Sequence, residues 1–223
     1  EDAACSLGTT QGNRWGSGRH LTCLSFHPRK VLTTGEGGAV GTDDEVIGDR
    51  LRCLRSHGMV MDPSAGWLRF QEAGFNYRMT DIAGCLGVVQ MQRLRQIVAA
   101  RREVVGWYRE RLDSHPLVRW PRGYDEPELS MQSLVVVLRD DVDRDQVIQT
   151  MATAGIGTTI GGYSVVEQPY YRRRYGLDPE AFPVSKALGR QSLTLPLTTT
   201  MVQQEVREVI SALEEAATAG GAR

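Results

Sequence analysis

The stretch SFHPRK at residues 25–30, followed by VLTTGEGG at residues 31–38, decides how the rest of the sequence is interpreted. It places Lys30 between a hydroxyl side chain five residues upstream and a glycine-rich turn just downstream. Lysines are mostly exposed, so a lysine beside a proline and a glycine turn is by itself typical of a solvated loop. The residues around this lysine, however, favour a chemical role.

Composition excludes several classes of function. The 223 residues suffice for one large domain or two modest ones. A net charge of -1 gives no electrostatic case for a nucleic-acid or membrane partner. The four cysteines form no C-x-x-C pair and the histidines show no metal-ligand spacing, so we expect neither a zinc site nor a disulfide framework. Free thiols are typical of a reducing compartment, and we expect a cytoplasmic protein.

Strand and helix patterns alternate along the sequence, which predicts an α/β protein. We expect strands at residues 20–26 and 38–42, on either side of the lysine loop. TDDE at residues 42–45 is a capping-box pattern that predicts a helix, with His57 in its last turn and Gly58 just beyond. Residues 59–73 are expected to form an irregular loop.

A second helical pattern begins at Thr80, a capping residue. Its apolar positions 82, 85, 86 and 89 form one stripe of the kind that packs against a core. The pattern continues to Leu112, which is too long for one typical globular helix. We therefore expect two helices, or one bent helix, that carry the chain from one domain to the next.

The segment 115–127 contains prolines and glycine and separates this helical region from a further α/β unit. Here we expect a buried strand at 133–138, a helix capped by Asp143, and a short helix at 185–190. Thr200 is expected to cap the last helix. A basic aromatic turn, YRRRY at 171–175, either attracts a diphosphate or is simply solvated.

Asp2, Ser25 and Lys30 together are consistent with a cofactor site. A lysine amine forms a Schiff base with an aldehyde cofactor. Pyridoxal phosphate fits, because its pyridinium nitrogen needs a carboxylate partner, and Asp2 ends a predicted strand. Ser25 can donate a hydrogen bond to the phosphate, and the glycines at 35–38 allow close approach of the backbone.

Four ordered motifs carry a family resemblance: EDAACSLG at residues 1–8, SFHPRK at 25–30, TGEGG at 34–38 and GFNYRMTDI at 74–82. Together they resemble successive signatures of the DegT/DnrJ/EryC1/StrS aminotransferases. These are pyridoxal-phosphate enzymes that place an amino group on keto sugars or related cyclitols. The resemblance implies a fold-type-I transferase, similar to aspartate aminotransferase. Residues 1–95 would be the C-terminal part of its large cofactor-binding domain, and residues 96–223 the connecting helix and small C-terminal domain.

The resemblance also implies roles for single residues. Lys30 would hold the cofactor and carry the proton between substrate and cofactor carbons. Asp2 would keep the pyridine nitrogen protonated, and Ser25 would bind the phosphate. Cys5, three positions after Asp2, would pack near the cofactor ring rather than act as a nucleophile.

A second motif residue, Asn76, would reach the phosphate of the neighbouring subunit, which implies a homodimer with a shared active site. Arg78 in the same motif either contacts substrate or supports the turn through a salt bridge. His57 precedes Gly58 in a family-like segment, although its position favours a helix-capping role.

The implied reaction moves an amino group from glutamate or glutamine to a keto group of a nucleotide-linked deoxysugar. A related group with the same fold has histidine at the lysine position and removes hydroxyl groups, so Lys30 favours amino transfer. Two alternatives stay open, namely a cyclitol or aminoshikimate-type aminotransferase and a non-catalytic regulator on the same fold.

The resemblance weakens in two places. IGGYSVVEQP at residues 160–169 departs from the histidines and prolines common in nucleotide-sugar enzymes, which leaves the sugar and nucleotide open. The family's phosphate-cradling helix start and ring-stacking aromatic residue precede the position of Asp2, so we expect an upstream portion of the large domain beyond these residues.

Overall fold

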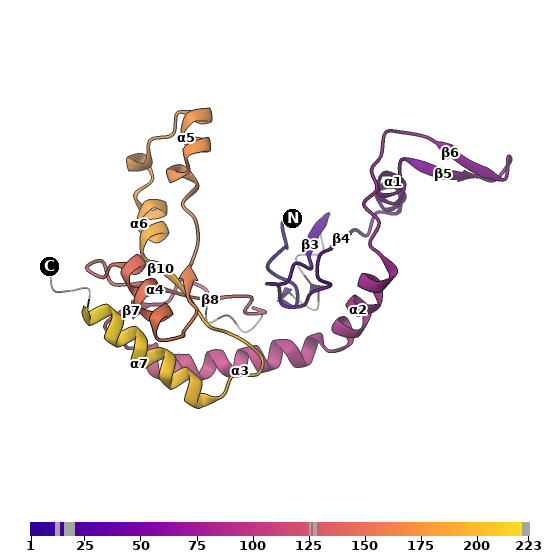
Figure 1. The fold of residues 1–223 in the computed structure, drawn as a ribbon. Helices are drawn as coiled ribbons and strands as arrows, with labels where there is room; N and C mark the ends of the chain where they lie inside the picture. The colour runs from indigo at the N-terminus through magenta and orange to yellow at the C-terminus, as the bar shows by residue number, and fades with distance from the viewer. Residues whose placement is uncertain (12–13, 16–20, 125, 127–128, 220–223) are drawn as a thin grey trace. The chain divides into compact units, whose positions relative to one another are not determined.

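The computed structural model describes residues 1–11, 14–15, 21–124, 126 and 129–219. Its chain divides into two compact units (Figure 1). The first unit comprises Glu1–Val98 together with Glu128–Gln132, and the second comprises Ala99–Pro127 and Ser133–Arg223. None of the helices in the described part of the chain combines the length and apolar character needed to cross a membrane.

The first unit is built from short antiparallel strand pairs and helices. Its elements are β1 (Thr10–Gln11), β2 (Arg14–Trp15), β3 (Thr22–Ser25), β4 (Gly38–Gly41), α1 (Glu45–Arg55), β5 (Met59–Asp62), β6 (Trp67–Phe70), α2 (Asp81–Gln92) and the start of α3 (Leu94–Leu112). The strands pair β1 with β2, β3 with β4 and β5 with β6. The strands predicted around the lysine loop are therefore present as β3 and β4, while His20 of the first prediction lies outside the described residues.

Helix α1 begins two residues later than the capping-box pattern predicts. Its N-cap is Asp44, whose carboxylate accepts a hydrogen bond from the Ile47 N–H at 3.0 Å. The Thr42 hydroxyl, two residues before this N-cap, accepts instead from the Asp44 N–H at 3.1 Å. The helix ends at Arg55, so the prediction that His57 lies in its last turn was wrong: His57 follows with φ +61 and Gly58 with φ +70.

The prediction of an irregular loop at residues 59–73 was also wrong. Figure 1 shows β5 and β6 as a hairpin that follows α1, with Met59 opposite Phe70 and Asp62 opposite Trp67. The turn is held by the Asp62 carboxylate, which accepts from the N–H groups of Ser64 and Ala65. The hydrogen bond from the Ser64 hydroxyl, together with these two from the backbone, holds the pKa of Asp62 below its usual range. The sequence DPSAG at 62–66, with its turn residues, was the available signal.

Helices α2 and α3 confirm the prediction of two helices, since the helical pattern breaks at Arg93. Thr80 caps α2 as predicted, accepting from the Ala83 N–H at 3.2 Å. The predicted apolar stripe does not pack inward in this structure: Ile82, Leu86 and Val89 are all exposed. Burial in the first unit lies elsewhere, in a small core of Leu7, Val31, Leu32, Leu94 and Val98.

The second unit is a four-stranded antiparallel sheet with helices. Its elements are the remainder of α3, β7 (Val118–Arg119), β8 (Leu134–Leu138), α4 (Arg144–Thr153), β9 (Thr159–Ile160), η1 (Val165–Glu167), α5 (Pro169–Tyr175), η2 (Pro179–Ala181), α6 (Pro183–Gln191), β10 (Ser192–Leu195) and α7 (Gln203–Ala219). The sheet order is β7-β8-β10-β9, with Val136 opposite Leu193. Figure 1 shows these elements in the later, pink-to-yellow part of the chain.

The core of this unit is apolar and well filled. Leu134, Val136 and Leu138 on β8 are fully buried, as are Met151 on α4 and Leu213 on α7. Alternating strands and helices with buried faces are what the sequence predicts here, and Asp143 caps α4 as expected. Two details differ: α7 begins at Gln203, three residues after Thr200, and YRRRY at 171–175 is helical rather than a turn.

Candidate functional site

The lysine loop is a closed turn between β3 and β4. The Phe26 N–H donates to the Gly37 carbonyl at 2.9 Å, and the Phe26 carbonyl accepts from the Thr34 N–H at 3.1 Å and from the Thr33 hydroxyl at 2.9 Å. Inside this closure the Lys30 N–H donates to the His27 carbonyl at 2.9 Å. The loop's conformation is therefore set by backbone hydrogen bonds rather than by solvent.

The residues that follow Lys30 anchor the loop to the small core. Val31 and Leu32 are 6% and 2% exposed, whereas the Lys30 side chain is half-buried. Burying two consecutive apolar residues stabilises the turn by roughly 1.5–3 kcal/mol for each side chain. The lysine is thus presented from a fixed backbone.

Two glycines permit the close return of the chain. A Cβ built on Gly38 would lie 2.7 Å from the Leu24 carbonyl oxygen, and one on Gly37 would lie 2.6 Å from the Thr34 hydroxyl. Gly37 also has φ +155, outside the range that side chains favour. In the TGEGG motif, a side chain at either of the last two positions would therefore clash with the loop.

The segment that begins at Asp2 runs beside β3. Asp2 forms a parallel bridge with Cys23, and the Ala3 N–H donates to the Cys23 carbonyl at 2.9 Å. The Asp2 carboxylate accepts from the Ala4 N–H at 3.1 Å, which fixes the turn that follows. Asp2 and Cys5 are exposed while Ala3 between them is buried, so the polar side chains project from an anchored backbone.

The structure brings these two segments into contact. The Lys30 amine nitrogen, Nζ, lies 2.9 Å from the Cys5 sulfur, Sγ. Ser25 lies at the end of β3, opposite Gly38, and its hydroxyl accepts from the His27 N–H at 3.4 Å. Four of the six predicted site residues, Asp2, Cys5, Ser25 and Lys30, are thus gathered around β3 and its loop.

Asn76 and Arg78 lie on another segment, beside the end of α1. Asn76 forms an antiparallel bridge with Ser56, and Arg78 Nη1 donates to the Ser56 hydroxyl at 3.1 Å. Both side chains are exposed. Arg78 supports this turn through a hydrogen bond to a hydroxyl rather than through the salt bridge that was one of its two expected roles.

Sequence reasoning missed a residue that holds the lysine loop from far along the chain. The Gln132 side chain accepts from the Val31 N–H at 3.0 Å and donates to the Arg29 carbonyl. The neighbouring Ser130 exchanges hydrogen bonds with Thr9 at 3.1 Å. No local pattern marks Ser130 and Gln132 for this role, because these partners are more than a hundred positions away.

The scarcity of lysine is a second feature that bears on the site, and it can be seen in the sequence itself. Lys30 and Lys186 are the only lysines among the 223 residues. Lys186 on α6 is ion-paired with Glu180. A cofactor that attaches to a lysine side chain of these residues therefore has two candidate amines, and that of Lys186 is already paired with the Glu180 carboxylate.

The donor set fits pyridoxal phosphate. An amine at Lys30, a carboxylate at Asp2 and a hydroxyl at Ser25 match an aldehyde, a pyridinium nitrogen and a phosphate respectively. Within the described residues no group of three or more histidine, cysteine or acidic side chains could hold a metal ion. All four cysteines are free thiols in the structure.

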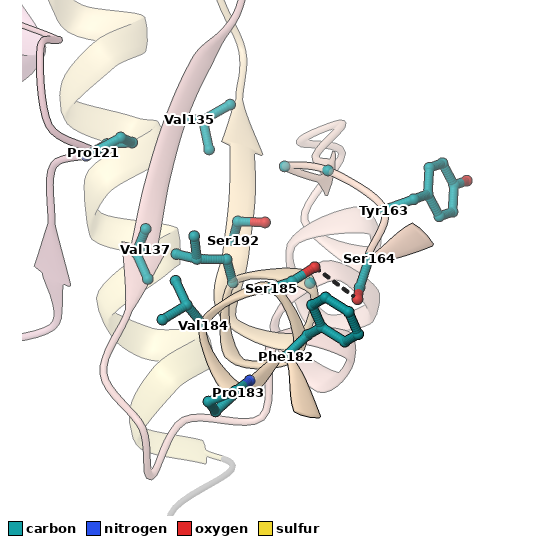
Figure 2. Close-up of a pocket in the computed structure, with 14 residues that line it drawn as sticks. Pro121, Val135, Val137, Tyr163, Ser164, Phe182, Pro183, Val184, Ser185 and Ser192 are labelled. Atoms are coloured by element: carbon teal, nitrogen blue, oxygen red, sulfur yellow. Dashed lines mark hydrogen bonds between the residues drawn. The ribbon is translucent and has the colours of Figure 1, made fainter. Parts of the chain in front are cut away.

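A pocket of about 710 Å³ opens in the second unit, between the sheet and α6 (Figure 2). Val135 and Val137 of β8 and Val184 of α6 line it, and Figure 2 shows the 3.1 Å hydrogen bond between the Ser164 and Ser185 hydroxyls. A Cβ on Gly161 would lie 2.7 Å from Val135 Cγ1, so glycine permits the loop to meet the sheet. Residues 161–164 of the segment IGGYSVVEQP, where the resemblance weakens, line this pocket.

Comparison with known proteins gives a match over nearly the whole chain. A model of the DegT/DnrJ/EryC1/StrS aminotransferase family matches residues 1–214. GDP-perosamine synthase of Caulobacter vibrioides is 32% identical over 224 residues, covering 96% of this chain and 57% of that protein. Spore coat polysaccharide biosynthesis protein SpsC of Bacillus subtilis is 30% identical, covering 96% of this chain and 58% of its own length. The chain thus spans a little over half the length of the curated relatives it matches.

Solved structures agree in fold. A sugar aminotransferase structure from Streptococcus pneumoniae, in its PMP-form, superimposes with a TM-score of 0.89 at 25% identity, covering 98% of this chain and 58% of that chain. Helicobacter pylori PseC, an aminotransferase involved in pseudoaminic acid biosynthesis, superimposes with a TM-score of 0.89 at 19% identity and 98% and 59% coverage. These neighbours confirm the predicted fold-type-I architecture, of which the described residues form a part.

Proposed function

This chain belongs to the DegT/DnrJ/EryC1/StrS aminotransferase family, and from that premise we propose that it acts as a pyridoxal-phosphate-dependent aminotransferase on a nucleotide-linked keto sugar. The observation that carries the proposal is the position of the Lys30 amine, 2.9 Å from Cys5 and held by a closed loop next to the Asp2 segment. Glutamate or glutamine is the proposed amino donor, by the family resemblance.

Pyridoxal phosphate is the cofactor of this family, and one of the matching S. pneumoniae structures is in its PLP-form. When bound, it supplies an electron sink that stabilises negative charge on the carbon attached to the transferred nitrogen. Lys30 would bind its aldehyde carbon and Asp2 its ring nitrogen. Ser25 would bind its phosphate, and Cys5 would pack near the ring.

Lys30 has a second task once its amine is released. The amine would carry a proton between the substrate and cofactor carbons, a step that a positioned group accelerates about 10²–10⁴-fold. Asp2 would keep the proton on the ring nitrogen by supplying an adjacent negative charge. Fixed backbone positions for both residues keep the two groups oriented without further ordering cost.

The nucleotide-linked sugar is proposed on the name of one relative, GDP-perosamine synthase, at 32% identity. The amino group would go to a ketone of a deoxysugar carrying a nucleoside diphosphate. The departure of residues 160–169 from the usual family pattern is the reason to keep cyclitols as the competing substrate class.

A direct assay separates the candidates. The protein is incubated with pyridoxal phosphate, glutamate or glutamine, and either a nucleotide-linked keto-deoxysugar or a keto cyclitol, and products are identified by mass spectrometry. Amination of the sugar supports the proposal, whereas amination of the cyclitol alone contradicts its substrate class. Binding of cofactor with no transfer to either class would favour a regulator.

We also propose a homodimer in which Asn76 completes the neighbouring subunit's site. Asn76 is exposed and is bridged to Ser56 rather than to the lysine loop, which is consistent with a contact to the site of another subunit. Mixing inactive Lys30→Ala and Asn76→Ala subunits tests this arrangement, because one site of each mixed dimer would contain both native residues. Recovered activity supports the shared site, and continued inactivity with proven exchange contradicts it.

The proposed compartment is the cytoplasm. All four thiols are free, and such thiols persist where glutathione and thioredoxin keep them reduced. Fractionation of the native cells, with immunodetection of the protein, tests this placement. Recovery in the soluble cytoplasmic fraction is expected, and recovery outside the cell would contradict it.

A further inference from the structure

The Lys30 amine contacts the thiol of Cys5, so two nucleophilic side chains lie next to each other. The amine nitrogen Nζ lies 2.9 Å from the thiol sulfur Sγ, slightly closer than the about 3–3.5 Å at which oriented groups react. Cys5 is exposed, so a small oxidant can reach its sulfur. Oxidation converts a thiol sulfur into an electrophile. The Lys30 amine is therefore a nucleophile placed next to an atom that oxidation would make reactive toward it.

Both reactive side chains are held by their neighbours. Cys5 lies between Ala3 and Leu7, which are 1% and 5% exposed, and the Ser6 N–H donates to the Ala3 carbonyl at 3.0 Å. Lys30 precedes buried Val31, whose N–H donates to Gln132. Because both backbones are anchored, the two atoms cannot separate by more than side-chain rotation allows.

We propose that Cys5 and Lys30 form a reversible oxidative cross-link, a sulfur–nitrogen bond, when the protein is free of cofactor and meets a hydroperoxide. Only the effect on cofactor uptake rests on the proposed function: a cross-linked Lys30 has no free amine with which to take up pyridoxal phosphate. The cross-link itself requires only the contact described above.

The chemistry balances in two steps. Hydrogen peroxide transfers one oxygen to the Cys5 sulfur, which gives a sulfenic acid and one water, so sulfur is oxidised as the peroxide O–O bond is reduced. The lone pair of Lys30 Nζ then forms the S–N bond while the S–O bond breaks, and the leaving hydroxide departs as a second water with the proton from nitrogen. Two molecules of an added thiol reverse the bond, restoring thiol and amine and becoming a disulfide.

Cofactor already held by Lys30 occupies the same nitrogen and protects it. Cys23 and Cys85 are also exposed, and within the described residues no hydrogen bond joins either sulfur to a lysine amine, so they serve as internal controls for general oxidation.

The test uses the purified protein, freed of cofactor and treated with hydrogen peroxide before protease digestion and mass spectrometry. The expected product joins the peptide containing Cys5 to that containing Lys30, lighter by two hydrogens than the separate peptides. Cys5→Ser and Lys30→Arg should both abolish it, and Cys85→Ser should not. In Lys30→Arg, labelling of the Cys5 sulfenic acid by dimedone should rise, because no amine condenses with it.

Cofactor uptake provides the second readout. Uptake by the oxidised protein should fall in proportion to the cross-linked fraction, and dithiothreitol should restore it. Oxidation of Cys5 with Lys30 left unmodified, or a linked peptide that retains an oxygen atom, would overturn the inference. If the reduced protein takes up no cofactor at Lys30 while the cross-link still forms, the proposed function fails and this inference stands.

Discussion

Lys30 and Cys5 are 25 positions apart in sequence, and the lysine amine lies 2.9 Å from the cysteine sulfur. The contact joins the two parts of the site that come from different backbone segments, the turn after Asp2 and the loop after β3. Each segment is fixed by backbone hydrogen bonds and buried neighbours, so the meeting of the two side chains follows from the local fold.

Removing the lysine amine should abolish turnover. Lys30→Ala loses the attachment point and the proton carrier, and the second loss alone corresponds to about 10²–10⁴-fold in rate. Lys30→Arg should be equally inactive, because a guanidinium keeps the charge but cannot attach to the aldehyde. Steady-state transamination assays check this, with Lys186→Ala as the matched control that keeps its activity. Near-normal transfer by either Lys30 variant would refute the assignment.

Neutralising Asp2 should separate binding from catalysis. In Asp2→Asn the amide can still contact the ring but supplies no negative charge to hold the ring proton. We expect cofactor to bind more weakly but detectably, and most of the turnover to disappear. Titration of cofactor binding and measurement of kcat on the same preparation compare the two effects. Unchanged kcat would remove Asp2 from its proposed role.

Closing the lysine loop should depend on Gly38. Gly38→Ala places a Cβ 2.7 Å from the Leu24 carbonyl oxygen, a backbone atom that cannot move aside on its own. We expect a loss of about 1–3 kcal/mol in unfolding free energy, typical of overpacking, and weaker cofactor binding. Gly41→Ala is the matched control on the same strand, since a Cβ there meets nothing within 4 Å. Equal stability of the two variants in urea titrations would contradict this account.

The second unit should lose stability at alkaline pH through Tyr108. Burial raises the pKa of Tyr108 well above its usual range, and the charge of Glu205 adds to this effect. A folded pKa above the unfolded value means that the stabilisation is complete below about pH 10, the pKa of an unfolded tyrosine, and declines as pH rises further. The slope reaches about 1.4 kcal/mol per pH unit for one group.

Tyr108→Phe should reduce this alkaline slope while costing about 1–3 kcal/mol near neutrality, because the Pro196 carbonyl loses the hydroxyl that donates to it at 3.0 Å. Part of the slope should persist, since burial also raises the pKa of Tyr124. Urea titrations across the alkaline range measure both effects. An exposed tyrosine variant, Tyr163→Phe, should leave the slope as it is; the same slope in Tyr108→Phe and in the unaltered protein would be the contradicting result.

The sequence could predict the strands beside the lysine loop, the break between α2 and α3, and the α/β character of the second unit. Each of these follows from local signals: apolar runs, capping residues and turn glycines. The hairpin of β5 and β6 was missed, because its exposed Trp67 and Phe70 give no alternation of buried and polar positions. The start of α1 was misplaced because Thr42 and Asp44 are both good capping residues and only the three-dimensional structure decides between them.

For the site, motif order along the chain named Lys30, Asp2, Cys5 and Ser25, and the structure gathers these four around β3. What could not be predicted is non-local. Gln132 reaches Val31 across about a hundred positions, and no periodicity or motif in the sequence links those two residues. The distance between Lys30 and Cys5 was equally hidden, since it depends on how two turns meet.

The most direct test of the central claim, that Lys30 anchors the cofactor, is to fix the bound cofactor chemically and locate it. The protein is loaded with pyridoxal phosphate, reduced with borohydride so that the link to lysine becomes permanent, digested, and mapped by mass spectrometry. Only Lys30 and Lys186 offer lysine side chains among the 223 residues. We expect the cofactor on Lys30; its appearance on Lys186, or on neither lysine, would show that Lys30 is not the anchor.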